Sequence, residues 1–147
     1  MPLVADRAGS VDTSVPVRIV FLGGLGEIGR NCMAIEQGAA DDPNRTIMLI
    51  DCGLMFPEAN MHGVDLILPD FTYLRENANR IQALVLTHGH EDHVGAIQYL
   101  LRDHDGIGDL RDDPLPIYGS RLALGIARNR IEEAGLMPKT DMRSVGD

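Results

Sequence analysis

Short apolar runs separated by polar turns recur along most of this chain, and their periods predict alternating strands and helices. Runs rich in Val, Ile and Leu, bounded by Gly, Asp, Asn or Pro, predict strands over 17–22, 31–36, 46–50, 81–86 and 115–119. Apolar positions three or four residues apart predict helices between and after these strands. The pattern is that of an α/β domain.

Caps and apolar faces define the three predicted helices. Asp70 caps the first, whose inner face carries Phe71, Leu74 and Ala78. The second follows the strand over 81–86 and has these residues on one stripe: Val94, Ile97, Leu101 and His104, with His104 at the helix end. The third runs from a Ser120 cap to Ala134, ends at Gly135, and buries these side chains: Leu122, Ile126, Ala127 and Ile131. No closing element is expected after Lys139.

The glycine-rich stretch after the first strand invites a nucleotide-binding interpretation. Gly24, Gly26 and Gly29 match G-x-G-x-x-G, but a dinucleotide site requires a long helix to follow. Instead residues 31–36 alternate in polarity, and a turn over 41–44 leads into the next apolar run. The sequence therefore predicts a β-hairpin, with glycines that make a tight loop or let backbone approach closely.

The stretch from Thr87 to His93 carries the strongest chemical signal, because it holds three of the five histidines within 88–93. Imidazole and carboxylate groups are the donors that zinc prefers. The two-residue step between His88 and His90 puts both rings on one side of an extended backbone. Asp92 and His93 lie beyond a turn and can face a second ion, as in two-metal sites with ions about 3.5–4 Å apart. A solvated loop with incidental histidines is the weaker alternative.

Other polar and thiol groups have plainer interpretations. Asp51 ends the strand over 46–50, where an acid either points toward a site or forms a turn. His62 is expected on the surface of a loop. Cys32 and Cys52 are expected to be small buried thiols in a reducing compartment, with a zinc ligand as the less favoured alternative.

Composition is that of one globular domain. The chain has 147 residues, of which 44% are hydrophobic and 24% charged. No apolar segment approaches the roughly 20 residues of a membrane helix, and residues 1–16 read as a flexible tail, not a signal peptide. The net charge of −9 argues against binding nucleic acid by bulk charge, but it leaves open a nucleic-acid substrate held by metal ions.

Several motifs resemble a known family. Residues 87–95 (THGHEDHVG) resemble the signature of the metallo-β-lactamase superfamily. Four further stretches resemble bacterial ribonuclease J: LGGLGEIGRN (22–31), IDCGLMFPE (50–58), GVDLILPDFTYL (63–74) and PIYGSRLAL (116–124). The resemblance starts near Val17 and implies the N-terminal portion, over 17–147, of an αββα four-layer sandwich. The sandwich would be incomplete here, with its second half, the β-CASP domain and the C-terminal domain absent.

The resemblance also implies a function. Ribonuclease J enzymes are cytoplasmic zinc-dependent 5′-to-3′ exonucleases and endonucleases in RNA processing and decay. By resemblance His88 and His90 would bind one zinc, Asp92 and His93 the second, and Asp51 would orient these ligands. The further ligands lie downstream of the aligned region. RNA is the implied partner, no membrane is implied, and the family's homo-oligomers are not expected of this chain.

Because the further zinc ligands would lie outside the aligned region, the activity of this chain by itself is expected to be low. A catalytic zinc normally takes three protein ligands plus water, and this chain offers two per ion, so it is expected to be inactive alone. An uncovered sheet face is also expected to favour aggregation. Two alternatives stay open: a related hydrolase acting on a small thioester or lactam, and a non-catalytic truncated product that binds metal weakly or not at all.

Overall fold

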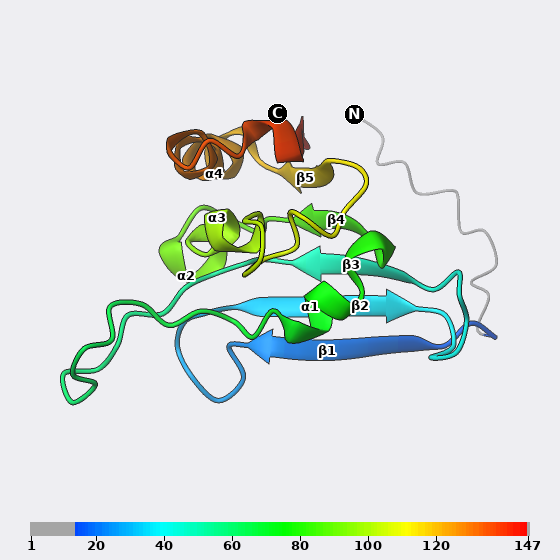
Figure 1. The fold of residues 1–147 in the computed structure, drawn as a ribbon, viewed down its shortest axis with the longest axis horizontal. Coiled ribbons are helices and arrows are strands. Elements are labelled where there is room, and N and C mark those ends of the chain that lie inside the picture. The colour runs from blue at the N-terminus through cyan, green and yellow to red at the C-terminus, as the bar shows by residue number, and fades with distance from the viewer. Residues whose placement is uncertain (1–13, 147) are drawn as a thin grey trace.

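A six-stranded sheet organises the part of the chain that the computed structural model describes, residues 14–146 (Figure 1). Its strands are adjacent in chain order: β1 (Val17–Gly23), β2 (Cys32–Gln37), β3 (Thr46–Ile50), β4 (Ile81–Val85), β5 (Leu115–Gly119) and β6 (Thr140–Ser144). The first three strands pair antiparallel, and β3 to β6 pair parallel. Most of the predicted tail over 1–16 lies outside the described residues.

Short helices connect the parallel strands, as parallel pairing requires. In chain order they are α1 (Thr72–Glu76), η1 (Ala78–Arg80), α2 (Glu91–Val94), α3 (Ile97–Leu100), α4 (Arg121–Glu133) and η2 (Met137–Lys139). The predicted α/β class is confirmed. No described helix is long and apolar enough to cross a membrane.

The predicted hairpin is confirmed, and the dinucleotide interpretation fails. β2 and β3 pair antiparallel, with Ala34 opposite Leu49, and the glycine-rich stretch leads straight into β2 instead of a helix. In the turn between the two strands, a side-chain oxygen of Asp42 accepts a hydrogen bond from the Asn44 N–H at 2.8 Å. This Asx-type bond explains why a polar cluster separates the two apolar runs.

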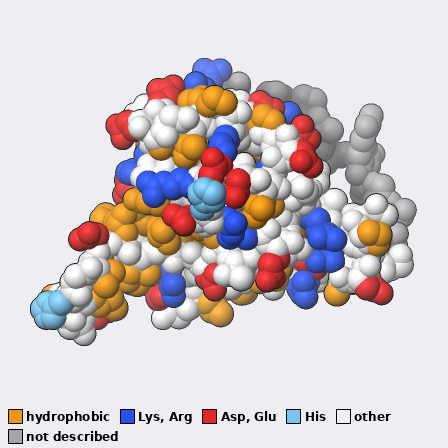
Figure 2. All heavy atoms as spheres, viewed as in Figure 1, with side chains coloured by type: hydrophobic (Ala, Val, Ile, Leu, Met, Phe, Trp, Pro, Cys, Tyr) orange, Lys and Arg blue, Asp and Glu red, His pale blue; other side chains and the backbone are white. Residues whose placement is uncertain are grey.

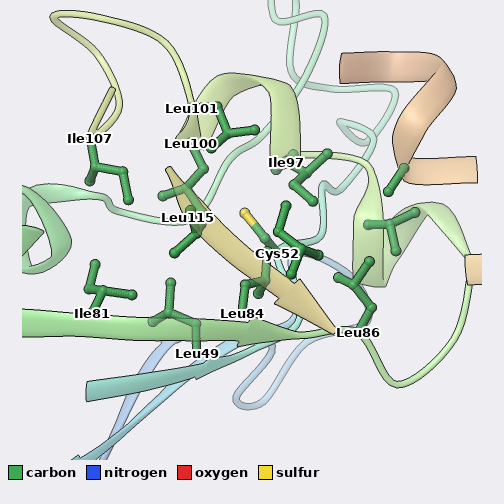
Figure 3. Close-up of a cluster of buried hydrophobic side chains, with 14 of the residues drawn as sticks. Leu49, Cys52, Ile81, Leu84, Leu86, Ile97, Leu100, Leu101, Ile107 and Leu115 are labelled. Carbon is green, nitrogen blue, oxygen red and sulfur yellow. The ribbon is translucent and has the colours of Figure 1, made fainter. Parts of the chain in front are cut away.

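One face of the sheet packs against the helices and forms the core (Figure 3). Its fully buried side chains come from the strands and from α3, α4 and the connecting loops: Ile47, Leu49, Leu84, Leu115, Ile117, Ile97, Leu100, Ile107 and Ile131. Burying each such side chain contributes about 1.5–3 kcal/mol. Cys32 and Cys52 are buried free thiols, as predicted. A hydrogen bond with Cys32, together with burial, raises the pKa of Cys52 well above its usual value.

The helix predicted after the histidine motif is interrupted. The structure has two short helices there, α2 starting at Glu91 and α3 ending at Leu100. The Ala96 N–H, at the break, donates to the Cys52 carbonyl at 2.9 Å instead of to the preceding helical turn. His104 therefore lies beyond the helix, with φ +66° and a 91% exposed side chain, and its predicted place at the helix end is wrong.

Two predictions near the C-terminus are also wrong. The chain has a closing element after Lys139, because β6 pairs with β5, with Leu115 opposite Thr140. Leu122 is 74% exposed, because α4 turns Ala123, Ala127 and Ile131 inward at four-residue spacing. The caps of this helix are as predicted: the Ser120 hydroxyl accepts from the Ala123 N–H at 3.2 Å, and Gly135 follows the helix with φ +70°.

The first predicted helix is present but shorter. Asp70 accepts a hydrogen bond from the Thr72 N–H at 2.9 Å, although the residue at the N-cap position is Phe71, one residue later than predicted. Phe71, Leu74 and Ala78 are buried as predicted, with Ala78 in the 3₁₀ turn η1.

The other face of the sheet is open. Among the described residues, the positions of β1 to β4 that alternate with the core carry mostly apolar side chains that are exposed or half-buried. We call the following set the open face: Val17, Ile19, Phe21, Met33, Ile35, Met48, Ile50 and Val85. The structure thus has one sheet with helices on one side, which is half of a sandwich, and the predicted uncovered face is confirmed.

The open face predicts self-association of this chain. Substituting Phe21→Glu places a charge in the middle of the exposed apolar strand β1 and should shift the chain toward monomer in sedimentation velocity. Asn129→Glu, the charge-matched control on exposed α4, should leave the sedimentation profile unchanged. A wild-type chain that is already monomeric at high concentration would contradict the prediction.

A buried carboxylate ties the far end of β2 to its neighbours. Glu36 is 1% exposed; it accepts hydrogen bonds from the Tyr73 hydroxyl at 2.5 Å and from Arg18 at 2.8 Å, and Arg45 lies 3.6 Å away. Burial favours a higher pKa for Glu36, but the bonds from Tyr73 and Arg18 outweigh it and lower the pKa below its usual value. Burial, together with the Glu36 carboxylate, raises the pKa of Tyr73 to about 12.

The lowered pKa of Glu36 predicts a pH-dependent stability. Because the folded-state pKa lies below the unfolded value of 4.5, ionised Glu36 stabilises the fold above that pH. This stabilisation is lost as pH falls through the folded-state pKa. Glu36→Gln should lower the free energy of unfolding by about 1–3 kcal/mol at neutral pH, and by less in acid. Urea titrations at pH 7 and pH 3.5 measure this, with exposed Glu58→Gln as the control. An equal loss at both pH values would contradict it.

Candidate metal centre

Three chain segments meet at the carboxyl ends of β3 and β4, where the histidine motif lies. Residues 52–54 run between residues 30–31 and 91–96, and backbone hydrogen bonds join them on both sides. On one side Gly53 N–H donates to the Asn31 carbonyl at 2.9 Å; on the other Cys52 N–H donates to the His93 carbonyl at 2.8 Å. A Cβ on Gly53 would overlap the Asp92 carbonyl oxygen, so this junction requires glycine there.

The junction presents the predicted donor side chains together. His88 Nε2 lies 3.2 Å from His90 Nδ1, and Asp92 Oδ2 lies 3.4 Å from His93 Nε2. The His88 ring is also close to His93, with centroids 4.0 Å apart. His88, His90, Asp92 and His93 therefore share one partly exposed surface.

These separations fit metal ligands. Two atoms bound at about 2.1 Å to one tetrahedral zinc lie about 3.4 Å apart. Both pairs, His88 with His90 and Asp92 with His93, have nearly this spacing. In residues 14–146, no group of three or more His, Cys, Asp or Glu side chains is arranged to hold one ion. Among the described residues, the motif therefore offers two pairs of donor atoms at this spacing and no larger donor group.

Asp51 lies beneath the motif and is 4% exposed. Its Oδ1 accepts from the Thr87 backbone N–H at 2.8 Å, and its Oδ2 accepts from the Thr87 hydroxyl at 2.7 Å and lies 2.7 Å from His93 Nδ1. The backbone of Asp51 has φ +59°, a conformation that costs a non-glycine residue about 1–3 kcal/mol. The bond of its N–H to the Val85 carbonyl, at 2.9 Å, helps to hold that conformation.

These bonds fix which ring nitrogens carry protons. An ionised Asp51 only accepts, so His93 carries its proton on Nδ1 and leaves Nε2 unprotonated, as an acceptor or a metal ligand. The Thr87 hydroxyl donates its proton to Asp51 Oδ2. Its oxygen lies 2.9 Å from His88 Nδ1 and accepts a hydrogen bond from that ring nitrogen. His88 Nε2 is then also free to bind a metal.

Sequence reasoning missed two side chains at this centre. The Asn31 Nδ2 lies 3.2 Å from Asp92 Oδ2 and 3.4 Å from His93 Nε2, and the hydroxyl of Thr87 links Asp51 to His88. The signal for Asn31 was a polar residue at the start of the alternating run over 31–36, a position that needs no functional explanation. Arg130 of α4 pairs with Glu91, the first residue of α2.

A loop beside the centre projects from the molecule (Figure 1). It runs from Met55, which forms an isolated β-bridge with Ile67, and includes His62, exposed as predicted. Hydrophobic side chains gather along this projection (Figure 2); the exposed ones are Phe56, Met61 and Val64.

Comparison of the sequence with known protein families identifies the superfamily of this chain. Residues 25–123 match the sequence profile of the metallo-beta-lactamase superfamily, and the chain belongs to that superfamily. The match covers the histidine motif and most of the core strands. The predicted resemblance at superfamily level is therefore confirmed.

Individual relatives confirm the resemblance to ribonuclease J. The chain is 46% identical to ribonuclease J of Synechocystis over 88% of its length and 47% identical to that of Thermus thermophilus over 83%. It is 40% identical to ribonuclease J2 of Bacillus subtilis over 88%. The aligned region is 18–20% of each relative, so the chain spans about a fifth of their length. Human tRNase Z, short form, matches 86% of the chain and 44% of its own chain, with 19% identity and a TM-score of 0.46.

The position of Asp51 predicts its effect on the histidines. Asp51→Asn replaces an acceptor-only group by one that also donates, so one bond to Thr87 or His93 should be lost. We expect the free energy of unfolding to fall by about 1–3 kcal/mol. The proton of His93 should also move from Nδ1 to Nε2, which nitrogen-15 NMR of the imidazoles reports. Asp65→Asn, on the exposed loop, is the matched control. An unchanged His93 tautomer would refute this assignment.

Proposed function

We propose that this chain carries part of the two-zinc centre of an RNA-cleaving hydrolase. The observation that carries the proposal is the pair of donor sets on one loop, each near the spacing of ligands on a tetrahedral ion. RNA as the substrate is inferred from the names of the three bacterial relatives, which are ribonuclease J or ribonuclease J2. Similarity outside the histidine motif favours RNA over a small thioester or lactam.

The proposed ligands follow from the two donor pairs. His88 and His90 hold one zinc, and Asp92 and His93 hold the second. Bound zinc supplies a nucleophilic water near neutral pH and stabilises charge on phosphate oxygens during hydrolysis of the phosphodiester bond. Nitrogen and carboxylate donors suit zinc, and the free thiols lie buried in the core.

Asp51 and Thr87 have orienting roles in this proposal. Asp51 holds the proton of His93 on Nδ1, and Thr87 does the same for His88 through its hydroxyl. Both rings then direct Nε2 toward the metal side of the loop. A carboxylate that holds a ligating imidazole in one tautomer and orientation strengthens metal binding.

The donor count limits what this stretch does alone. A catalytic zinc takes three protein ligands, and the described residues offer two per ion. We therefore propose that the 147-residue chain by itself binds zinc weakly and cleaves RNA poorly or not at all. The exonuclease and endonuclease activities, and the role in RNA processing and decay in the cytoplasm, are proposed for the full-length product of the gene.

Net charge sets how RNA is bound in this proposal. With a net charge of −9 the chain repels phosphate at long range, so the metal ions must supply much of the local positive charge. Strong attraction between the bare chain and RNA at low salt would count against this view.

His90→Ala tests the proposal in the full-length gene product. The substitution removes one ligand of the first zinc, and RNA hydrolysis should fall by at least about 100-fold while the fold is kept. His62→Ala, on the exposed projecting loop, is the control and should retain wild-type turnover. Rates are compared on 5′-monophosphorylated RNA, with zinc content measured by mass spectrometry. Wild-type activity in His90→Ala, or hydrolysis unaffected by chelators, would refute the proposed function.

A further inference from the structure

We propose that Asn31 is a positioning residue for the metal ligands Asp92 and His93, and that the glycine-rich loop before it holds its amide in place. This inference rests on the proposed function, because it assigns a role within the same two-zinc centre. It gives a structural role to the glycine-rich stretch, which leads into strand β2 and not into a helix.

The Asn31 amide contacts both donors of one pair. Its Nδ2 lies 3.2 Å from Asp92 Oδ2, 3.4 Å from His93 Nε2 and 3.0 Å from the Asp92 carbonyl oxygen. The bonds of Asp51 go instead to Thr87 and His93. Asn31 is therefore placed to set the rotation of the Asp92 carboxylate relative to the His93 ring.

The main chain of Asn31 is anchored independently of this amide. Its N–H donates to the Asp92 carbonyl at 3.0 Å, and its own carbonyl accepts from the Gly53 N–H at 2.9 Å. Removing the side chain leaves these backbone bonds intact. A loss of ligand positioning can therefore be separated from a loss of the local fold.

Gly24 explains the orientation of the amide. A Cβ on Gly24 would lie 2.5 Å from the Asn31 Oδ1, and Gly24 has φ +84°, which favours glycine. The Oδ1 packs against the bare glycine backbone, so Nδ2 faces Asp92 and His93. Glu27 stabilises this loop, because its Oε1 accepts hydrogen bonds from the Gly24 N–H at 3.1 Å and from Arg30 Nε at 2.5 Å.

A neutral donor is well suited to this place. A lysine or arginine could also fix the Asp92 carboxylate, but its positive charge would repel a divalent cation a few ångströms away. The amide of Asn31 restrains the carboxylate rotation without adding charge. The expected consequence is selective: the ion bound by Asp92 and His93 depends on Asn31, and the ion bound by His88 and His90 does not.

Zinc affinity of Asn31→Ala, measured in the full-length gene product, tests this assignment. Competition titration with a chelator should show one of two ions weakened about 10–100-fold and the other unchanged. For RNA hydrolysis, kcat should fall with KM nearly unchanged. Gly24→Ala leaves the amide present but displaces it, and should weaken the same ion. Asn129→Ala, on exposed α4, is the control and should bind both ions as the wild type does.

The outcomes separate this inference from the proposed function. Equal weakening of both ions in step with a lower Tm would mean a purely structural role for Asn31 and would overturn the inference. Two ions at wild-type affinity in both Asn31→Ala and Gly24→Ala would overturn it as well, while leaving the proposed function standing. A wild-type protein that binds no zinc would overturn the proposed function and the inference together.

Discussion

The backbone junction between residues 30–31, 52–54 and 91–96 is the constraint on which the candidate centre depends. Several N–H and carbonyl groups of these segments pair with one another across the junction, although residues 91–94 also form the short helix α2. The Asp92 carbonyl accepts from the Asn31 N–H, and the Ala96 N–H donates to Cys52. A continuous helix would need both groups for itself. The break between α2 and α3, and the outward presentation of the donor side chains, are two results of the same pairing.

Asp51 extends this constraint from the backbone to the side chains. It stands where β3 leaves the sheet, in a left-handed conformation held by hydrogen bonds to β4 and to the motif. A buried carboxylate is costly unless its oxygens are satisfied, and Thr87 and His93 satisfy them. The same bonds that stabilise the charge fix the protons of the histidine rings. Stability of the fold and orientation of the candidate ligands therefore share one cause.

Local patterns were sufficient to predict much of this structure. Strands β1 to β5, the hairpin and the caps of α4 depend on alternation, turn residues and capping within a few positions. The candidate ligands were predictable because His88, His90, Asp92 and His93 are chemically distinctive and close in sequence. The superfamily followed from that same stretch. Each of these features is encoded where it occurs, so the sequence alone determined it.

Tertiary structure decided the features that depend on residues far apart in the chain. Asn31 and Asp92 are 61 positions apart, and neither residue alone signals the contact. Strand β6 looks polar in the sequence and exists because β5 offers a free edge. Leu122 is exposed because the packing of α4 against β5 sets the rotation of the helix. The physical reason is common to all three: a hydrogen bond or buried face needs its partner, and only folding brings the partner near.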